Sequence, residues 1–194
     1  MAEMMKGNEA IAEAAIRAGA RFYAGYPITP SSEIMEYLSW RMNEVGGAFV
    51  QAESELAGIN MVIGASSCGV RALTASSGPG ISLKQEGIST LCDEGLPAVV
   101  ITQVRYGNGL GTLFTSQCDY HRETHGGGQG DYRCIVLCPS SIQEFVDLML
   151  PAYELAEKYR IVTIMMGEGT LGQMMEPVEL PDFVEPKRTP WALN

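Results

Sequence analysis

The sequence alternates between short apolar runs and longer segments in which apolar residues recur with helical spacing. Runs typical of strands lie at residues 20–24, 48–50, 71–75, 98–102, 134–137 and 161–165. Segments typical of helices lie at residues 7–18, 29–42, 53–65, 80–95 and 141–158. Strand–helix–strand units close as right-handed crossovers, so this order predicts an α/β fold whose mainly parallel sheet is flanked by helices on both faces.

Length and charge limit the class of protein. The chain has 194 residues, enough for one sizeable domain and short for two. Its 13 Lys and Arg against 23 Asp and Glu give a net charge of −10, which argues against nucleic acid or an anionic membrane as a partner because both attract clustered positive charge. Residues 1–6 lack the apolar core of a signal peptide, and no run reaches membrane-spanning length. We therefore expect a cytoplasmic protein.

Cysteine and histidine do not form the pattern of a metal site. The five cysteines are dispersed and contain no Cys-x-x-Cys pair: Cys68, Cys92, Cys118, Cys134 and Cys138. Free cysteine is often a small buried residue, so we expect buried structural thiols. His121 and His125 have the spacing of a helical ligand pair, but three glycines follow them and we interpret both as loop residues.

Two segments and one proline interrupt the alternation. Residues 105–131 form a long, polar, Gly-rich stretch, and loops of that length are usually functional or disordered. Residues 176–194 are rich in proline and predict a linker from a domain at residues 1–175 to a missing C-terminal domain. Pro151 lies inside the last helical segment, which it is expected to kink or break.

Three turns that follow strands are candidates for ligand contact, because ligands of open α/β sheets gather at the carboxyl ends of strands. The first is Tyr26–Ser32, where prolines stiffen the turn and Thr29 and Pro30 resemble the cap and first turn of a helix. Another is Thr74–Gly80, whose small residues let a ligand approach the backbone closely. Each also fits a bland interpretation, as a capped helix and a tight turn with nothing bound.

The remaining turn, Gln51–Glu55, carries two acids at the start of a helix. On a helical wheel Glu55 falls within the apolar arc, whereas Glu53 lies at its margin. That arc is formed by Leu56, Ile59, Val62 and Ile63. A carboxylate on a buried face must be protonated or paired, so Glu55 is the stronger candidate for chemistry. A salt bridge or a simple preference of acids for the helix start remains open.

Arg105 follows the apolar run 98–102 at the mouth of the long loop. A guanidinium in this position could bind a substrate carboxylate through two parallel hydrogen bonds. The alternative is an ordinary solvated arginine.

Taken together, three motifs resemble the α-type chain of the 2-oxoacid:ferredoxin oxidoreductases. They are Lys6-Gly7-Asn8-Glu9-Ala10, Gly25-Tyr26-Pro27-Ile28-Thr29-Pro30-Ser31 and Gln51-Ala52-Glu53-Ser54-Glu55. Four further stretches are similar to the branched-chain 2-oxoisovalerate enzymes: Gln85–Ser89, Gly109–Thr112, Gly126–Tyr132 and Leu171–Val178. The resemblance covers nearly the whole chain.

The resemblance implies a thiamine diphosphate enzyme of anaerobic metabolism that oxidatively decarboxylates a 2-oxoacid, transfers the acyl group to coenzyme A and reduces ferredoxin. It implies that this chain has the pyrimidine-domain fold and holds the aminopyrimidine end of the cofactor. A diphosphate-binding β subunit with its Mg²⁺ and a ferredoxin-like subunit with iron–sulfur clusters would be its partners, in a dimer of heteromers. No metal site is expected in this chain.

The same resemblance implies roles for individual residues. Glu55 would hydrogen-bond the pyrimidine ring nitrogen and so activate the thiazolium carbon, which requires a desolvated carboxyl that can share a proton. Tyr26, Pro27 and Ile28 would contact the cofactor. Thr29 would lie near the substrate, and Arg105 would pair with its carboxylate.

Two departures from the family pattern concern the long loop and the length. Tyr106–Gly109 stands where a Gly-Gly-Pro-like run is expected, a departure that leaves the register of the loop and the substrate choice open. The chain also stops in a proline-rich linker where family members continue into a further α/β domain, so we interpret it as a fragment or an isolated domain. We expect it to be inactive alone, because the other half of the site is missing. Two other functions remain open, a non-oxidative thiamine-dependent 2-oxoacid decarboxylase subunit and a non-catalytic interaction module that retains the fold.

Overall fold

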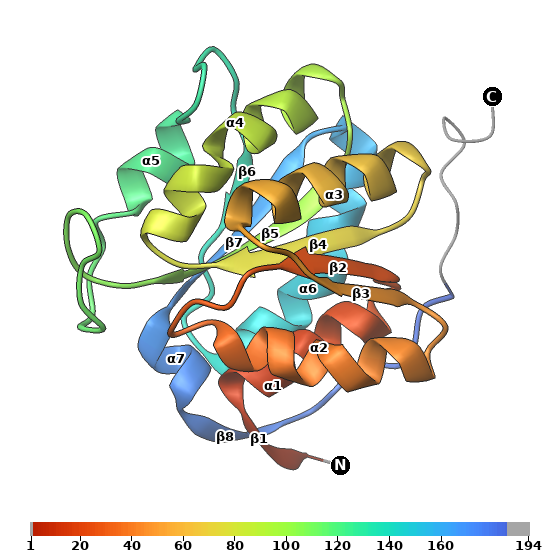
Figure 1. Cartoon of the computed structure of the whole chain (residues 1–194). Helices are drawn as coiled ribbons and strands as arrows, with labels where there is room; N and C mark the ends of the chain where they lie inside the picture. Colours follow the sequence, from red (N-terminus) through yellow and green to blue (C-terminus); the bar gives the residue numbers. More distant parts are fainter. Residues whose placement is uncertain (1, 186–194) are drawn as a thin grey trace.

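A computed structural model describes residues 2–185 of the chain. Its centre is a parallel six-stranded sheet with the order β3-β2-β4-β5-β7-β6 (Figure 1). The strands are β2 Phe22–Gly25, β3 Ala48–Gln51, β4 Ala72–Ser76, β5 Ala98–Val104, β6 Ile135–Leu137 and β7 Val162–Glu168. The helices are α1 Gly7–Arg17, α2 Ser32–Glu44, α3 Glu55–Ser67, α4 Pro79–Asp93, α5 Tyr120–His125, α6 Ile142–Tyr159 and α7 Gly169–Gln173. The α/β fold predicted from the sequence is confirmed.

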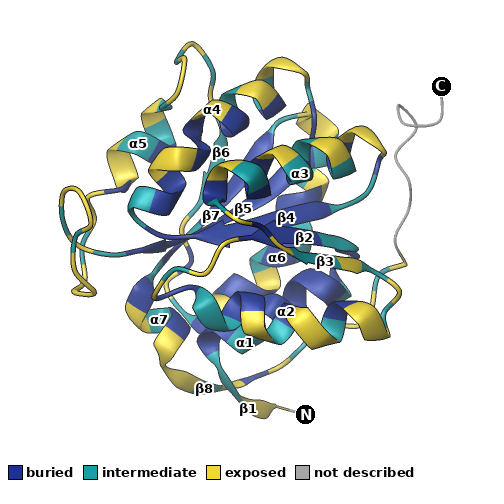
Figure 2. Ribbon diagram, in the orientation of Figure 1, coloured by how far each residue is buried: buried dark blue, intermediate teal, exposed yellow. Residues whose placement is uncertain are grey.

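Helices cover both faces of this sheet. In Figure 1, α3 and α4 lie above it and α1 and α2 lie below it. Strands β4 and β5 occupy its middle, and every residue of both strands is buried, as Figure 2 shows by the dark blue of this layer. Strands covered on both faces are expected to be continuously apolar rather than alternating, which explains the runs in the sequence.

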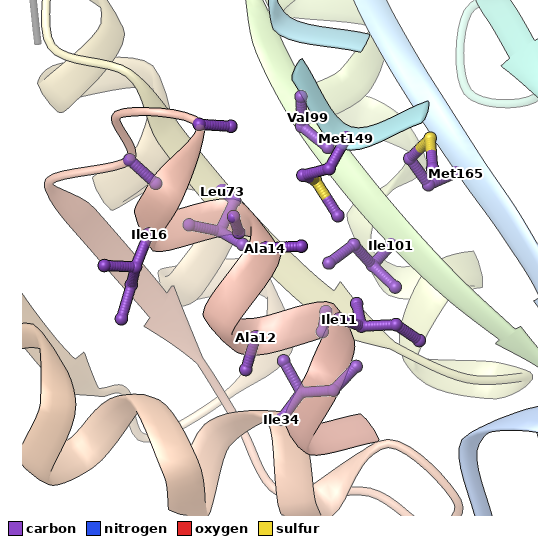
Figure 3. Packing of buried hydrophobic residues seen from close by; sticks show 14 of the residues in the cluster. Ile11, Ala12, Ala14, Ile16, Ile34, Leu73, Val99, Ile101, Met149 and Met165 are labelled. Carbon is purple, nitrogen blue, oxygen red and sulfur yellow. The ribbon is translucent and has the colours of Figure 1, made fainter. Parts of the chain in front are cut away.

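The larger apolar core lies on the face covered by α1, α2 and α6. Figure 3 shows Ile11 of α1 beside Ile34 of α2 and Ile101 of β5, and all three are buried. The alanine-rich surface of α1 lets it pack closely against α6 and α2, since small side chains allow helices to approach. A second core joins α3 and α4 to the opposite face.

A short antiparallel pair lies outside the main sheet. Strand β1 Glu3–Lys6 pairs with β8 Met175–Val178, so Met5 lies opposite Glu176. Val178 is buried in the α1–α6 core, and the Val184 amide donates to the Arg17 carbonyl. The folded domain therefore continues past the boundary predicted at residue 175, and residues 186–194 of the predicted linker lie outside the described residues.

Two local predictions were wrong and a third was wrong in part. Helix α6 is continuous through Pro151, so the proline does not break it. His121 and His125 lie on α5, with their rings stacked at 4.1 Å, rather than in a loop. None of the five cysteines is fully buried, and Cys92 and Cys134 lie with their Sγ atoms 3.8 Å apart. Across residues 2–185 we find no cluster of three or more potential metal ligands and no helix long and apolar enough to cross a bilayer.

Candidate active site

The three turns singled out in the sequence lie together at the carboxyl-terminal end of the parallel strands. Strands β3, β2, β4 and β5 are neighbours, and in a parallel sheet their carboxyl ends lie together. These ends lead into Glu55, the turn Tyr26–Pro30, the turn Ser77–Gly78 and Arg105. The Ala52 amide donates to the Gly25 carbonyl at 2.9 Å and ties the first two turns together.

Glu55 is the first residue of α3 and is only 8% exposed. Ser54 caps this helix, because its Oγ accepts from the Ala57 amide at 3.1 Å. A Cβ atom added to Gly80 would lie 2.8 Å from Glu55 Oε1, so the carboxyl packs against the bare backbone of α4. Leu56, in contrast, is 44% exposed although the wheel placed it with the apolar arc. The prediction of a buried carboxyl at residue 55 is confirmed.

Beside Glu55 lie buried hydroxyl groups without partners. Ser76 and Ser77 are fully buried, and among residues 2–185 neither Oγ has a hydrogen-bond partner. Ser76 Oγ is close enough to Gly80 that an added Cβ would overlap it. Buried polar atoms are normally paired in folded proteins, and an unpaired group calls for an explanation such as a ligand. The Ser76 and Ser77 hydroxyls at the turn after β4 are therefore candidates for hydrogen bonds to a bound ligand.

Arg105 contacts the turn after β2. Its Nη1 donates to the Thr29 carbonyl at 2.7 Å and its Nη2 to the Leu110 carbonyl at 2.6 Å. Nε is buried without a partner within the described chain and lies against Gly78. The structure thus brings together the two residues that the resemblance assigned to the substrate, and leaves part of the guanidinium available.

The turn itself differs from the predicted helix start. Helix α2 begins at Ser32, after a cis peptide bond between Thr29 and Pro30. Ser31 Oγ donates backwards to the Ile28 carbonyl at 2.8 Å and does not cap the helix. Thr29 therefore precedes the helix, and its side chain remains exposed. Tyr26 and Pro27 are exposed beside it.

A buried polar network beneath this turn was missed from the sequence. Asn8 is fully buried, and its Nδ2 donates to the Pro30 carbonyl at 2.7 Å and to Glu33 at 2.8 Å. Its Oδ1 accepts from Gln103 at 3.0 Å. Lys6 and Gln173 complete the network through Glu33. The motif that starts at Lys6 was noticed as a family motif, but its contacts join residues too distant in sequence to be read from spacing.

A second group missed from the sequence lies in the long segment after β5. Arg122 of α5 makes ion pairs at 3.0 Å with Asp119 and Glu123, and its Nη1 donates to Ser82 at 3.0 Å. Burial raises the pKa of Glu123, while Arg122 opposes the shift. This network holds α5 against the start of α4. Large apolar side chains of the preceding loop are exposed: Tyr106, Leu110, Leu113 and Phe114.

A family model described as pyruvate flavodoxin/ferredoxin oxidoreductase, thiamine diphosphate-binding, matches residues 13–190. The chain belongs to this family. Its fold is also that of a solved 2-oxoglutarate:ferredoxin oxidoreductase from Magnetococcus marinus, described with 2-oxoglutarate, coenzyme A and succinyl-CoA bound. The TM-score is 0.90 at 32% identity, over 96% of this chain and 33% of that chain. The resemblance stated from the motifs is confirmed.

Curated relatives from this family have related names. A ketoisovalerate oxidoreductase subunit VorB from Methanothermobacter marburgensis is 51% identical over 98% of this chain and 55% of its own length. A 2-oxoglutarate synthase subunit KorA from Methanocaldococcus jannaschii is 46% identical over 94% of this chain and 50% of its own length. The chain spans about half the length of the curated relatives it matches.

The site fits the cofactor that the family name implies. Glu55 offers a buried carboxyl that accepts no hydrogen bond from another residue of the described chain, and the missing side chain of Gly80 lets this carboxyl lie against the backbone of α4. The unpaired Ser76 and Ser77 hydroxyls add polar groups suited to a heterocycle with ring nitrogens and an amino group. A carboxyl that must exchange a proton with a bound base needs such a desolvated position.

Proposed function

We propose that this chain supplies the pyrimidine-binding half of a thiamine diphosphate site in a 2-oxoacid:ferredoxin oxidoreductase. The reaction converts a 2-oxoacid and coenzyme A to acyl-CoA and carbon dioxide, and two electrons pass to ferredoxin. The relatives named for ketoisovalerate are more similar than those named for 2-oxoglutarate, which supports a branched-chain substrate.

The observation that carries this proposal is the buried Glu55 carboxyl beside Gly80. When bound, thiamine diphosphate supplies a carbon nucleophile that attacks the 2-oxo group and then stores the electrons of decarboxylation. Glu55 holds and releases the proton shared with the pyrimidine nitrogen. Its burial keeps water away from this exchange.

The other residues bind and orient. Tyr26, Pro27 and Ile28 form the turn that contacts the pyrimidine ring. Thr29 lies near the reacting carbons, and Arg105 pairs with the substrate carboxylate. The hydrogen bond from Arg105 to the Thr29 carbonyl supports these substrate roles, because it fixes both residues in one place.

The rest of the site belongs to partners in this proposal. A diphosphate-binding β subunit holds Mg²⁺, a ferredoxin-like subunit holds the iron–sulfur clusters, and two such heteromers associate as a dimer. The exposed apolar loop around Leu113 and Phe114 borders the candidate site and would be covered by such a subunit. The segment after residue 178 leads to a further domain, as the greater length of the relatives suggests.

Glu55→Gln in the reconstituted complex tests the proposal. We expect turnover to fall at least about 100-fold, because the amide can accept a hydrogen bond but cannot exchange the proton. Viologen reduction that depends on both coenzyme A and the 2-oxoacid is the measurement. Glu53→Gln is the matched control, since Glu53 is exposed two residues away and should retain activity.

Other results of these experiments would contradict the proposal or favour a different function. Near wild-type turnover of Glu55→Gln would remove the proposed role of the carboxyl. Release of carbon dioxide without dye reduction would favour the non-oxidative decarboxylase. Failure of the complete complex to bind thiamine diphosphate would favour the non-catalytic module, and substantial turnover by this chain alone would contradict the shared site.

A further inference from the structure

Lys84 is a fully buried lysine on α4, one helical turn after Gly80. Its Nζ donates to the main-chain carbonyl of Glu55 at 3.2 Å. In the described part of the chain this carbonyl is its one hydrogen-bond partner, although an ammonium group has three donors. A buried charge with so few partners is costly, so its retention beside Glu55 calls for a reason.

Lys84 lies where α3 packs closely on α4. A Cβ added to Gly58 of α3 would lie 3.4 Å from Nζ and 3.3 Å from the Cα of Gly25. One turn further along α4, a Cβ added to Gly87 would collide with Ile59. Gly80, Lys84 and Gly87 therefore form one face of α4, packed against the first two turns of α3.

Glu55 is the charged group that acts on Lys84 among the described residues. Burial lowers the pKa of Lys84 from 10.5 to about 8, and the Glu55 carboxylate opposes this shift. The neighbouring β2 backbone contributes Ala24 and Gly25, which carry no side-chain charge.

We propose that Lys84 is a positioning residue for Glu55: its amino group, bound to the Glu55 main-chain carbonyl, fixes the first turn of α3 and with it the position of the carboxyl. This inference rests on the proposed function of Glu55. A charged amino group makes a stronger hydrogen bond to the Glu55 carbonyl than a neutral one, so loss of the Lys84 proton loosens the first turn of α3. Lys84 thus acts through Glu55 and need not touch cofactor or substrate.

The direct test is the titration of Lys84 in the full chain by NMR, with ¹³C at Cε of lysine. The sequence holds lysine only at Lys6, Lys84, Lys158 and Lys187, so arginine substitutions at the other three assign the Lys84 signal. We expect a midpoint near 8 in the wild type, and a midpoint lower by about half a pH unit or more in Glu55→Gln, where the carboxylate is gone. An unchanged midpoint in Glu55→Gln, or one near 10.5 in the wild type, would overturn the proposal.

The second test uses turnover of the reconstituted complex between pH 6.5 and 9. For the wild type we expect kcat to fall as Lys84 loses its proton. For Lys84→Met we expect a kcat at least about tenfold lower at pH 7, no such fall with pH, and a nearly unchanged KM for the 2-oxoacid. Lys158→Met, at an exposed lysine of α6, is the control and should keep the wild-type profile.

The two tests separate this proposal from the proposed function. The NMR titration needs neither cofactor nor partner, so it stands even if the complex proves inactive with every 2-oxoacid. Wild-type kcat and pH profile in Lys84→Met would overturn the positioning role while leaving Glu55 itself in place. If Lys84→Met does not fold, the titration of the wild type and Glu55→Gln still decides.

Discussion

The two sides of the candidate site differ in how many of their buried polar groups have hydrogen-bond partners. Below the turn after β2, Asn8 and Glu33 share hydrogen bonds with Lys6, Gln103 and Gln173, and of this group only Gln103 Oε1 is buried without a partner among residues 2–185. Beside α3 and α4, the hydroxyls of Ser76 and Ser77 have no partner in the described chain, and the buried Lys84 has one. We call the first group the Asn8 cluster and the second the Glu55 cluster, which also includes Glu55 and Gly80.

The difference indicates which group of residues stabilises the fold and which serves ligand binding. Groups that satisfy each other stabilise a local shape, and their removal should lower the stability of the fold. Groups left unpaired in the chain alone cost free energy, and they are expected where a ligand later completes them. The Asn8 cluster thus holds the turn that carries Thr29, while in the proposed function the Glu55 cluster would contact the cofactor. Substitutions should therefore affect stability in one cluster and activity in the other.

The largest loss of stability is expected from Asn8→Ala. It removes three hydrogen bonds and leaves the buried Gln103 amide without its acceptor. We expect the free energy of unfolding to fall by about 2–4 kcal/mol, measured by urea denaturation of the chain. Gln173→Ala is the control, because Gln173 is exposed and donates to the same acceptors. A loss below about 1 kcal/mol for Asn8→Ala would contradict the supporting role of this cluster.

Gly80→Ala should affect activity more than stability. The added methyl group collides with Ser76 Oγ and Glu55 Oε1, so the carboxyl must move. We expect turnover of the complex to fall at least about tenfold, and stability to change by about 1–2 kcal/mol. The matched control is Gly64→Ala in α3, where a Cβ meets nothing within 4 Å and the helix should gain up to about 1 kcal/mol. Equal activity in both variants would show that Glu55 tolerates displacement.

The sequence predicted the sheet and its helices because these elements bury large apolar faces that appear as periodicity. It also indicated Glu55, since a carboxyl within an apolar arc is visible on a wheel. It could not reveal β1 and β8, whose four-residue runs pair only with each other, from opposite ends of the domain. Asn8 and Lys84 were missed for the same reason. Their partners lie 95 and 29 residues away, and only the fold brings them together.

A smaller loss of stability is expected when the charge of Glu33 is removed. Burial raises its pKa, but hydrogen bonds from Lys6, Gln173 and Asn8 outweigh this and hold the pKa below 4.5. The stabilisation is therefore present above the unfolded pKa of 4.5 and is lost as pH falls through the lower folded value. At pH 7 we expect the free energy of unfolding of Glu33→Gln to be about 1 kcal/mol below that of the wild type. Between pH 5 and 3 it should fall less steeply than that of the wild type, because the variant has no carboxylate here to protonate.

Denaturation across this pH range measures the effect. Glu36→Gln on the same helix is the control, because Glu36 is exposed. Parallel acid transitions for the wild type and Glu33→Gln would show that the charge of Glu33 does not stabilise the fold.

The smallest effect on stability is expected from Ser76→Ala, and it is the sharpest test of the comparison. The Ser76 hydroxyl is buried without a partner, so its removal should leave the free energy of unfolding unchanged within about 0.5 kcal/mol, or raise it. If the hydroxyl serves a ligand, the same variant should weaken binding of thiamine diphosphate to the complex several-fold, as calorimetry would measure. Ser66→Ala is the matched control, because the buried Ser66 hydroxyl donates to the Pro97 carbonyl at 2.7 Å, and its loss should cost about 1–2 kcal/mol without changing cofactor affinity. Equal losses of stability in the two serine variants would mean that the Ser76 hydroxyl is satisfied within the chain, and the distinction between the two clusters would fail at that residue.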